Sequence, residues 1–206
     1  MIGAICALAL GQAVGGPQAL DTLKSTLFDG LLAQHSPQRA NSSSRELAET
    51  ITQDLRQGKV LEAQILSYAD GDTVHLQFAG DATDIKCRLI GIDTPEKKSQ
   101  PDLAQAATTH LQELTSAKTV WVSSDQELFD KYGRLLIYLW TSEPRNTGDL
   151  DLLINYHMVN DGFAEALAVK PNTAHRKELE AAERSAVQGN RGLWEQGDFS
   201  KRQRYS

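Results

Sequence analysis

The middle of the chain reads Arg88-Leu89-Ile90-Gly91-Ile92-Asp93-Thr94-Pro95-Glu96. Its apolar first half predicts a buried strand, and Pro95 restricts the backbone after it, which predicts a stiffened turn. That turn carries two carboxylates, Asp93 and Glu96, while Arg88 at the head of the strand supplies a planar cation that suits phosphate. Metal-assisted attack on a phosphodiester requires groups of these kinds. A strand followed by a polar turn without catalytic function also fits the nonapeptide.

Four other segments have the patterns of strands, and together with the strand over 85–92 they suggest a barrel. They are residues 60–66, 72–78, 119–122 and 135–140. Asp70-Gly71 predicts a tight turn between the first two, so the first three strands form an antiparallel meander. Pro101 opens a helix after the third strand, and further helices are predicted over 152–161 and, capped by Asn172, over 173–187. This order predicts an α+β fold, a five-stranded β-barrel of the oligonucleotide-binding (OB) type with about three packed helices.

The part of the chain before the barrel is predicted to form an extension. Residues 1–19 are an apolar segment, 20–58 a helical extension with a linker, 59–198 the barrel domain, and 199–206 a short basic tail. The stretch 2–14 is too short for a stable membrane span of about 20 residues, but it has the length of an export signal's apolar core. We therefore expect a secreted, periplasmic or cell-envelope protein, although no cation precedes Lys24.

The overall charge constrains what the surface does. The formal net charge of −6 argues against a surface broadly designed to attract nucleic acid. A polyanionic substrate would therefore need a local cluster of cations or a bound metal. The two cysteines, Cys6 and Cys87, do not form a disulfide framework, and Cys87 is expected to be a small core residue.

The meander brings separate clusters of polar residues to one place. In such a topology the end of one strand can lie beside the start of the next but one. Asp72 and Asp93 are therefore expected to meet at one rim of the barrel, with Arg88 nearby.

Three motifs follow one another in a specific order. They are Asp-Gly-Asp-Thr-Val at 70–74, the nonapeptide at 88–96, and Asp-Lys-Tyr-Gly-Arg at 130–134. This combination resembles the micrococcal (thermostable) nuclease family. The similarity continues through Asn155, residues 158–162, Lys170-Pro171-Asn172 and Gly192-Leu193-Trp194, so it covers about residues 60–196.

The resemblance implies a calcium-dependent phosphodiesterase. Such an enzyme hydrolyses DNA and RNA, here with single strands preferred, and leaves 3′-phosphate ends; a monomer is expected. Matching the motifs position by position implies that Asp72 and Asp93 bind Ca²⁺ together with the backbone carbonyl of Thr94. Hard oxygen donors of this kind suit calcium, with water and substrate phosphate completing its shell.

The same matching assigns the remaining roles. Glu96 is implied as the general base for the attacking water, Arg88 and Arg134 as the phosphate clamp, and Lys131 and Tyr132 as phosphate and nucleotide contacts. Family members carry nucleotide-holding tyrosines before the Lys-Pro-Asn stretch. This chain has Leu167 and Val169 at about those places, so a changed grip on the nucleotide is expected.

Two other functions remain open at this stage. A non-catalytic barrel would bind single strands through aromatic platforms and basic grooves, but it would not need the acids and arginines. A magnesium-dependent nuclease of the restriction type is suggested by Glu96-Lys97-Lys98, although Pro95 and the turn disfavour the strand that such enzymes use. The histidines are interpreted as surface or structural residues, because no pair has the spacing of metal ligands.

Overall fold

The structure is a computed structural model that describes residues 42–79 and 83–197. Several predictions concern other parts of the chain: the apolar segment 1–19, the first part of the helical extension, the turn at Gly80-Asp81 and the basic tail 199–206. These lie outside the described residues.

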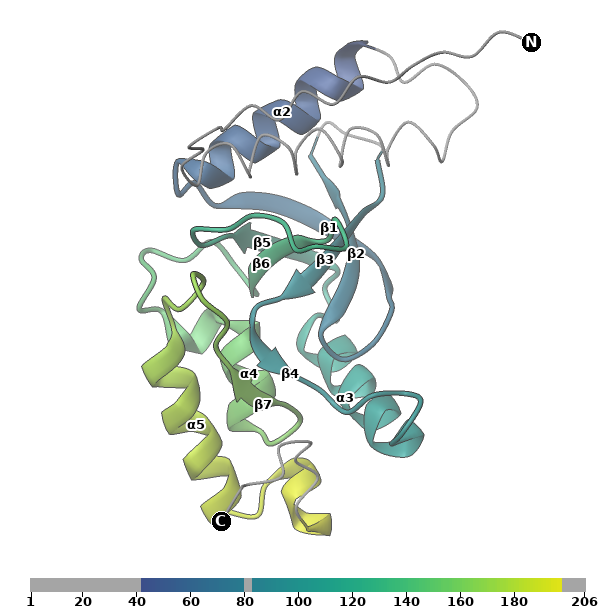
Figure 1. The fold of residues 1–206 in the computed structure, drawn as a ribbon, viewed down its shortest axis with the longest axis vertical. Coiled ribbons are helices and arrows are strands. Elements are labelled where there is room, and N and C mark those ends of the chain that lie inside the picture. Colours follow the sequence, from purple (N-terminus) through teal and green to yellow (C-terminus); the bar gives the residue numbers. More distant parts are fainter. Residues whose placement is uncertain (1–41, 80–82, 198–206) are drawn as a thin grey trace, which may run out of the picture.

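Five strands form a closed barrel, as predicted (Figure 1). They are β1 (Leu61–Tyr68), β2 (Thr73–Phe78), β3 (Ile85–Leu89), β5 (Thr119–Ser123) and β6 (Leu135–Trp140), in the order β1-β2-β3-β6-β5. The pairs β1–β2, β2–β3, β1–β5 and β5–β6 are antiparallel, whereas β3 and β6 run parallel. β3 alternates buried and more exposed residues, and Cys87 is fully buried in it, as expected for a small core residue.

The predicted third strand over 85–92 is in fact two strands. β3 ends at Leu89, and β4 (Gly91–Asp93) leaves the barrel and pairs with β7 (Glu165–Leu167), a strand that the sequence pattern did not predict. Gly91 has a positive φ of 80°, which side chains disfavour, and a Cβ there would lie 2.6 Å from Leu179 Cδ1. Asp93 is consequently the last residue of a strand, and the turn starts only after it.

Four α-helices are described around the barrel. They are α2 (Ser42–Arg56), α3 (Pro101–Leu114), α4 (Ile154–Asn160) and α5 (Arg176–Gln188), with short 3₁₀ helices η1 (Leu150–Leu152) and η2 (Gly192–Gln196). α2 contacts β1 at one end of the molecule, and α4 and α5 pack together near the β4–β7 pair at the other (Figure 1). None of the helices in 42–79 and 83–197 has the length and apolar character needed to cross a membrane.

One hydrophobic core joins the barrel to the helices. It includes Leu55 of α2, the inward residues of the strands, Ile154 of α4 and Leu179 of α5. The segment between β3 and α3 therefore runs between two well-packed bodies, the barrel and the α4–α5 layer, and this is the segment that carries Asp93 and Glu96.

Candidate active site

Asp72, Arg88, Asp93 and Thr94 form one network at the barrel rim, which we call the carboxylate–arginine cluster. The Arg88 guanidinium forms ion pairs with both carboxylates, through Nη1 to Asp72 Oδ1 and through Nη2 to Asp93 Oδ1 at 3.1 Å. Both the backbone N–H and the Oγ1 of Thr94 donate hydrogen bonds to Asp72 Oδ2, at 3.0 Å each. The predicted meeting of Asp72 and Asp93 beside Arg88 is therefore observed.

The strand register explains this meeting. Thr73, the first residue of β2, is the register partner of Arg88 in β3, so Asp72 lies next to the arginine. The backbone N–H of Leu89 donates to the Asp72 carbonyl at 2.8 Å and extends the pairing by one step. The break at Gly91 then turns β4 so that Asp93 returns to the same guanidinium.

A buried asparagine supports that break. Asn155 of α4 is fully buried, and its Nδ2 donates to the Ile90 carbonyl at 2.8 Å while its Oδ1 accepts from the Leu139 N–H at 2.9 Å. Sequence reasoning recorded Asn155 only as part of a motif. An asparagine among apolar helix residues was the available signal, because a buried amide needs partners and therefore fixes the backbone that it contacts.

The cluster is largely withdrawn from solvent. The side chains of Asp72, Arg88 and Asp93 are 7%, 15% and 24% exposed. Burial lowers the pKa of Arg88, Asp93 acts against this, and the neighbouring positive charge of Arg134 lowers the pKa further. An arginine nevertheless keeps its charge at neutral pH, so the rim presents a fixed cation between two anions.

Arg134 is held beside the cluster by its own turn. Asp130 Oδ1 accepts hydrogen bonds from the backbone N–H groups of Tyr132 and Arg134, at 2.8 and 3.0 Å. Asp130 Oδ2 pairs with Arg134 Nε at 2.7 Å, and Arg134 Nη1 reaches Thr73 Oγ1 at 3.5 Å. Two guanidinium groups near each other suit an anion with several oxygens, such as a phosphodiester.

Glu96 occupies a different environment. It lies in the turn after β4, three residues beyond Asp93, and its side chain is exposed. Its backbone carbonyl accepts hydrogen bonds from the N–H groups of Ser99 and Gln100, at 3.1 and 2.8 Å. The structure thus places Glu96 on the same segment as the cluster, with its side chain exposed to solvent.

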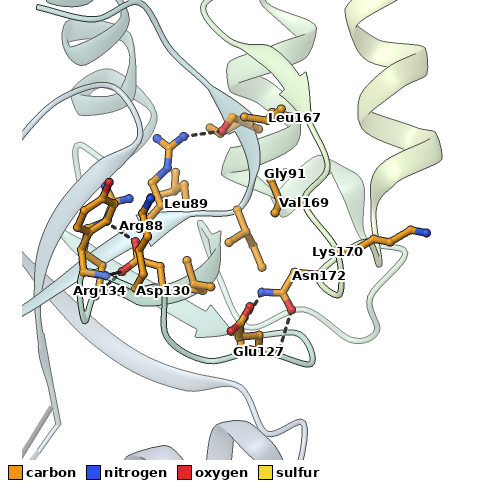
Figure 2. A pocket seen from close by; sticks show the side chains of 15 residues that line it. Arg88, Leu89, Gly91, Glu127, Asp130, Arg134, Leu167, Val169, Lys170 and Asn172 are labelled. Carbon is orange, nitrogen blue, oxygen red and sulfur yellow. Dashed lines mark hydrogen bonds and ion pairs between the residues drawn. The ribbon is translucent and has the colours of Figure 1, made fainter. Parts of the chain in front are cut away.

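A cavity of about 490 Å³ opens next to the two arginines (Figure 2). Its walls include Leu89, Leu136, Leu167 and Val169, and Lys131 and Tyr132 also line it. Tyr132 and Val169 are 66% and 62% exposed, so both stand at the open side. Leu167 and Val169 stand at about the places where family members are expected to carry tyrosines. Both line the cavity and present aliphatic side chains to it.

The predicted role of Asn172 as a helix cap is wrong. α5 begins at Arg176, and Asn172 instead accepts from the Glu127 N–H at 2.7 Å and donates to the Glu127 carbonyl at 2.8 Å. This reciprocal pair ties the loop before β6 to the loop after β7 beneath the cavity (Figure 2). Asparagine serves helix caps and backbone bridges alike, so its type alone did not decide between them.

The oxygen atoms of Asp72, Asp93 and the Thr94 carbonyl are of the type that binds an oxygen-preferring cation. Within the described part of the chain no three His, Cys, Asp or Glu side chains gather as a metal site. The predicted set has two carboxylates and the Thr94 carbonyl, and the carboxylates lie within reach of a single guanidinium. These are hard oxygen donors, which calcium takes in protein sites together with water and substrate oxygens.

Comparisons with known proteins agree with the motif analysis. The family model described as "Staphylococcal nuclease homologue" matches residues 86–196, more than half of the chain. A thermonuclease of Staphylococcus intermedius is 32% identical over 130 residues, covering 61% of this chain and 71% of that protein. A thermonuclease of Staphylococcus hyicus is 27% identical (64% and 74% covered), and an uncharacterized endonuclease of Escherichia coli is 30% identical (67% and 80% covered).

Proposed function

The chain belongs to the staphylococcal nuclease family, and from this premise we propose that it is a calcium-dependent phosphodiesterase that hydrolyses DNA and RNA to 3′-phosphate products. The resemblance to the micrococcal nuclease family is thereby confirmed. Family membership and relatives named as thermonucleases and endonucleases support a nuclease that hydrolyses phosphodiester bonds.

One observation carries the proposal: Arg88 contacts both Asp72 and Asp93, with Arg134 beside it. Acids and arginines meet at a single rim, next to a cavity of about 490 Å³. A protein that only bound nucleic acid would gain nothing from holding two carboxylates at its binding surface, because they repel phosphate.

Each side chain then has a defined task. Arg88 and Arg134 bind the phosphate and offset the charge that grows on its oxygens in the transition state. Glu96, on the solvent side, accepts a proton from the attacking water. Asp72, Asp93 and the Thr94 carbonyl would hold Ca²⁺, which when bound supplies positive charge at the phosphate oxygen.

The substrate is a single strand in this proposal. A base enters the cavity beside Lys131 and Tyr132 only when it is not stacked in a duplex, and unpaired strands offer such bases without the energy of unstacking. The aliphatic walls at Leu167 and Val169 contact the base without a stacking partner on that side. Weak discrimination between bases is the expected result.

Cellular location and assembly remain proposals as well. We infer export to the envelope or beyond from the apolar stretch 2–14, with the nuclease domain at 59–198 acting as a monomer. Sequencing the mature N-terminus tests export: a start near Val14 supports cleavage of a signal, and a retained Met1 opposes it.

The activity is tested with single-stranded DNA in calcium, in magnesium and in a calcium chelator. We expect cleavage in calcium, its loss in chelator, and a kcat lower by about 10²-fold or more in Glu96→Gln, because the general base is removed. Asp102→Asn, on the exposed first turn of α3, is the control that removes a nearby acid.

The outcomes separate the hypotheses. Cleavage that persists in chelator, or an unchanged Glu96→Gln variant, contradicts the mechanism. Binding of single strands without cleavage under any condition supports the non-catalytic barrel instead.

A further inference from the structure

The turn that carries Glu96 is attached on both sides to one other turn. Two residues before it, Thr94 donates twice to Asp72 Oδ2. Immediately after it, the Lys97 Nζ donates a hydrogen bond to the backbone carbonyl of Ala69. Ala69 and Asp72 both lie in the turn between β1 and β2, so Glu96 stands between two contacts to the same turn, one to the Asp72 side chain and one to the Ala69 backbone.

The β1–β2 turn is fixed by its own hydrogen bonds and by close packing. The N–H groups of Ala69 and Asp70 donate to the Thr73 carbonyl at 2.9 and 3.3 Å. A Cβ added at Gly71 would lie 2.9 Å from Ala107 Cβ and 3.0 Å from Thr94 Cγ2, so the turn packs closely against α3 and Thr94. A residue anchored to this turn is therefore anchored to the barrel and to α3 together.

Only four residues, 97–100, connect Glu96 to the start of α3. Ser99 and Gln100 donate to the Glu96 carbonyl, and α3 begins at Pro101. Residues 96–99 are exposed, so burial does little to fix their conformation. The Lys97 contact thus supplies a link across the exposed half of the turn.

We propose that Lys97 is a positioning residue, whose ammonium fixes the Glu96 turn against the Ala69 carbonyl and so sets the direction from which Glu96 meets the attacking water. The inference rests on the proposed role of Glu96 as general base. Reaction rates depend steeply on such placement, since a displacement of about 1 Å can cost about 10²-fold.

A different role for Lys97 would be general attraction of the polyanionic substrate. Lys98 carries the same charge on the neighbouring exposed residue, so it provides a matched control. Attraction would make the two lysines alike in their effect on KM and on its salt dependence. If Lys97 instead positions Glu96, replacing Lys97 lowers kcat, whereas replacing Lys98 does not.

The test compares Lys97→Met, which keeps most of the aliphatic stem, with Lys98→Met on a single-stranded DNA substrate in calcium. We expect kcat to fall by about 10-fold or more in Lys97→Met with KM little changed, and kcat to be retained in Lys98→Met. In a Glu96→Gln background the Lys97→Met change should cost almost nothing further, because the group that it positions is already gone.

Hydrogen exchange gives a readout that does not depend on catalysis. The Ser99 and Gln100 amides, which bond to the Glu96 carbonyl, should exchange faster in Lys97→Met than in the parent and in Lys98→Met. Equal kcat in the two lysine variants, a full effect of Lys97→Met in the Glu96→Gln background, or unchanged exchange overturns the inference. A parent protein that does not cleave overturns the proposed function instead, and exchange alone still tests whether Lys97 holds the turn.

Discussion

Arg88 belongs to the carboxylate–arginine cluster and also lines the neighbouring cavity, but the two regions differ in burial and in polar contacts. In the cluster, Asp72 and Arg88 are nearly buried, and Asp72 is contacted through both carboxylate oxygens. Around the cavity, Tyr132 and Val169 are mostly exposed, and the walls combine apolar side chains with several charged ones. The cluster, which we propose for catalysis, is therefore fixed by several polar contacts, whereas the cavity, which we propose for the nucleotide, offers its shape and a few exposed side chains.

This difference separates chemistry from recognition. A change in the cluster should disturb several polar contacts together and reduce turnover or stability strongly. A change in the cavity wall should alter substrate affinity and leave the barrel intact. Three substitutions test this division.

The largest effect is expected for Arg88→Lys. Lysine keeps the charge but loses the planar fork that reaches two carboxylates and a phosphate, so kcat should fall by about 10²-fold. Steady-state kinetics on single-stranded DNA in calcium measures this, with Lys98→Arg as an exchange of the same two residue types outside the cluster. A fully active Arg88→Lys enzyme would show that only the charge matters.

Asp72→Asn should lower stability even where calcium is absent. The amide oxygen can still accept from Thr94, but the ion pair with buried Arg88 is lost, and breaking such a pair costs about 3 kcal/mol. Urea unfolding without calcium measures the change in the free energy of unfolding. Asp93→Asn is the comparison within the cluster and should cost less, because Asp93 is more exposed. Equal values for the two variants would contradict the idea that burial governs the cluster.

The smallest effect is expected from Val169→Tyr, which adds an aromatic face at the open side of the cavity. Stacking on a base contributes about 1 kcal/mol or more, so KM should fall by about 5-fold while kcat stays the same. Leu66→Tyr, an exposed change on β1 outside the cavity lining, serves as control. An unchanged KM would mean that the base does not contact Val169.

Sequence patterns predicted the barrel because its strands are short alternating or apolar runs and its turns have clear signals, such as Asp70-Gly71. They also predicted that Asp72, Arg88 and Asp93 would lie near one another, because the meander places Asp72 beside Arg88 and Asp93 follows five residues later. They missed the break at Gly91 and the strand β7, because three-residue strands are too short to show a period. A glycine inside an apolar run was the only local sign of the break.

The cavity was beyond sequence reasoning for a different reason. Its walls include residues of β3, β6 and β7, and no local pattern links Leu89, Leu136 and Leu167. The contact of Lys97 with Ala69 likewise joins residues 28 positions apart. Local patterns report which residues are buried, but side chains from distant segments make a binding surface, and their meeting depends on the completed fold.

The pairing of β4 with β7 has a consequence for the order in which the protein is made. Asp93 stands opposite Glu165, so the strand that carries this carboxylate gains its partner only when the chain has been synthesised beyond Leu167. The barrel strands are all translated earlier, the last of them ending at Trp140. The β4–β7 pair that holds Asp93 is therefore completed by a part of the chain that is made after all five barrel strands.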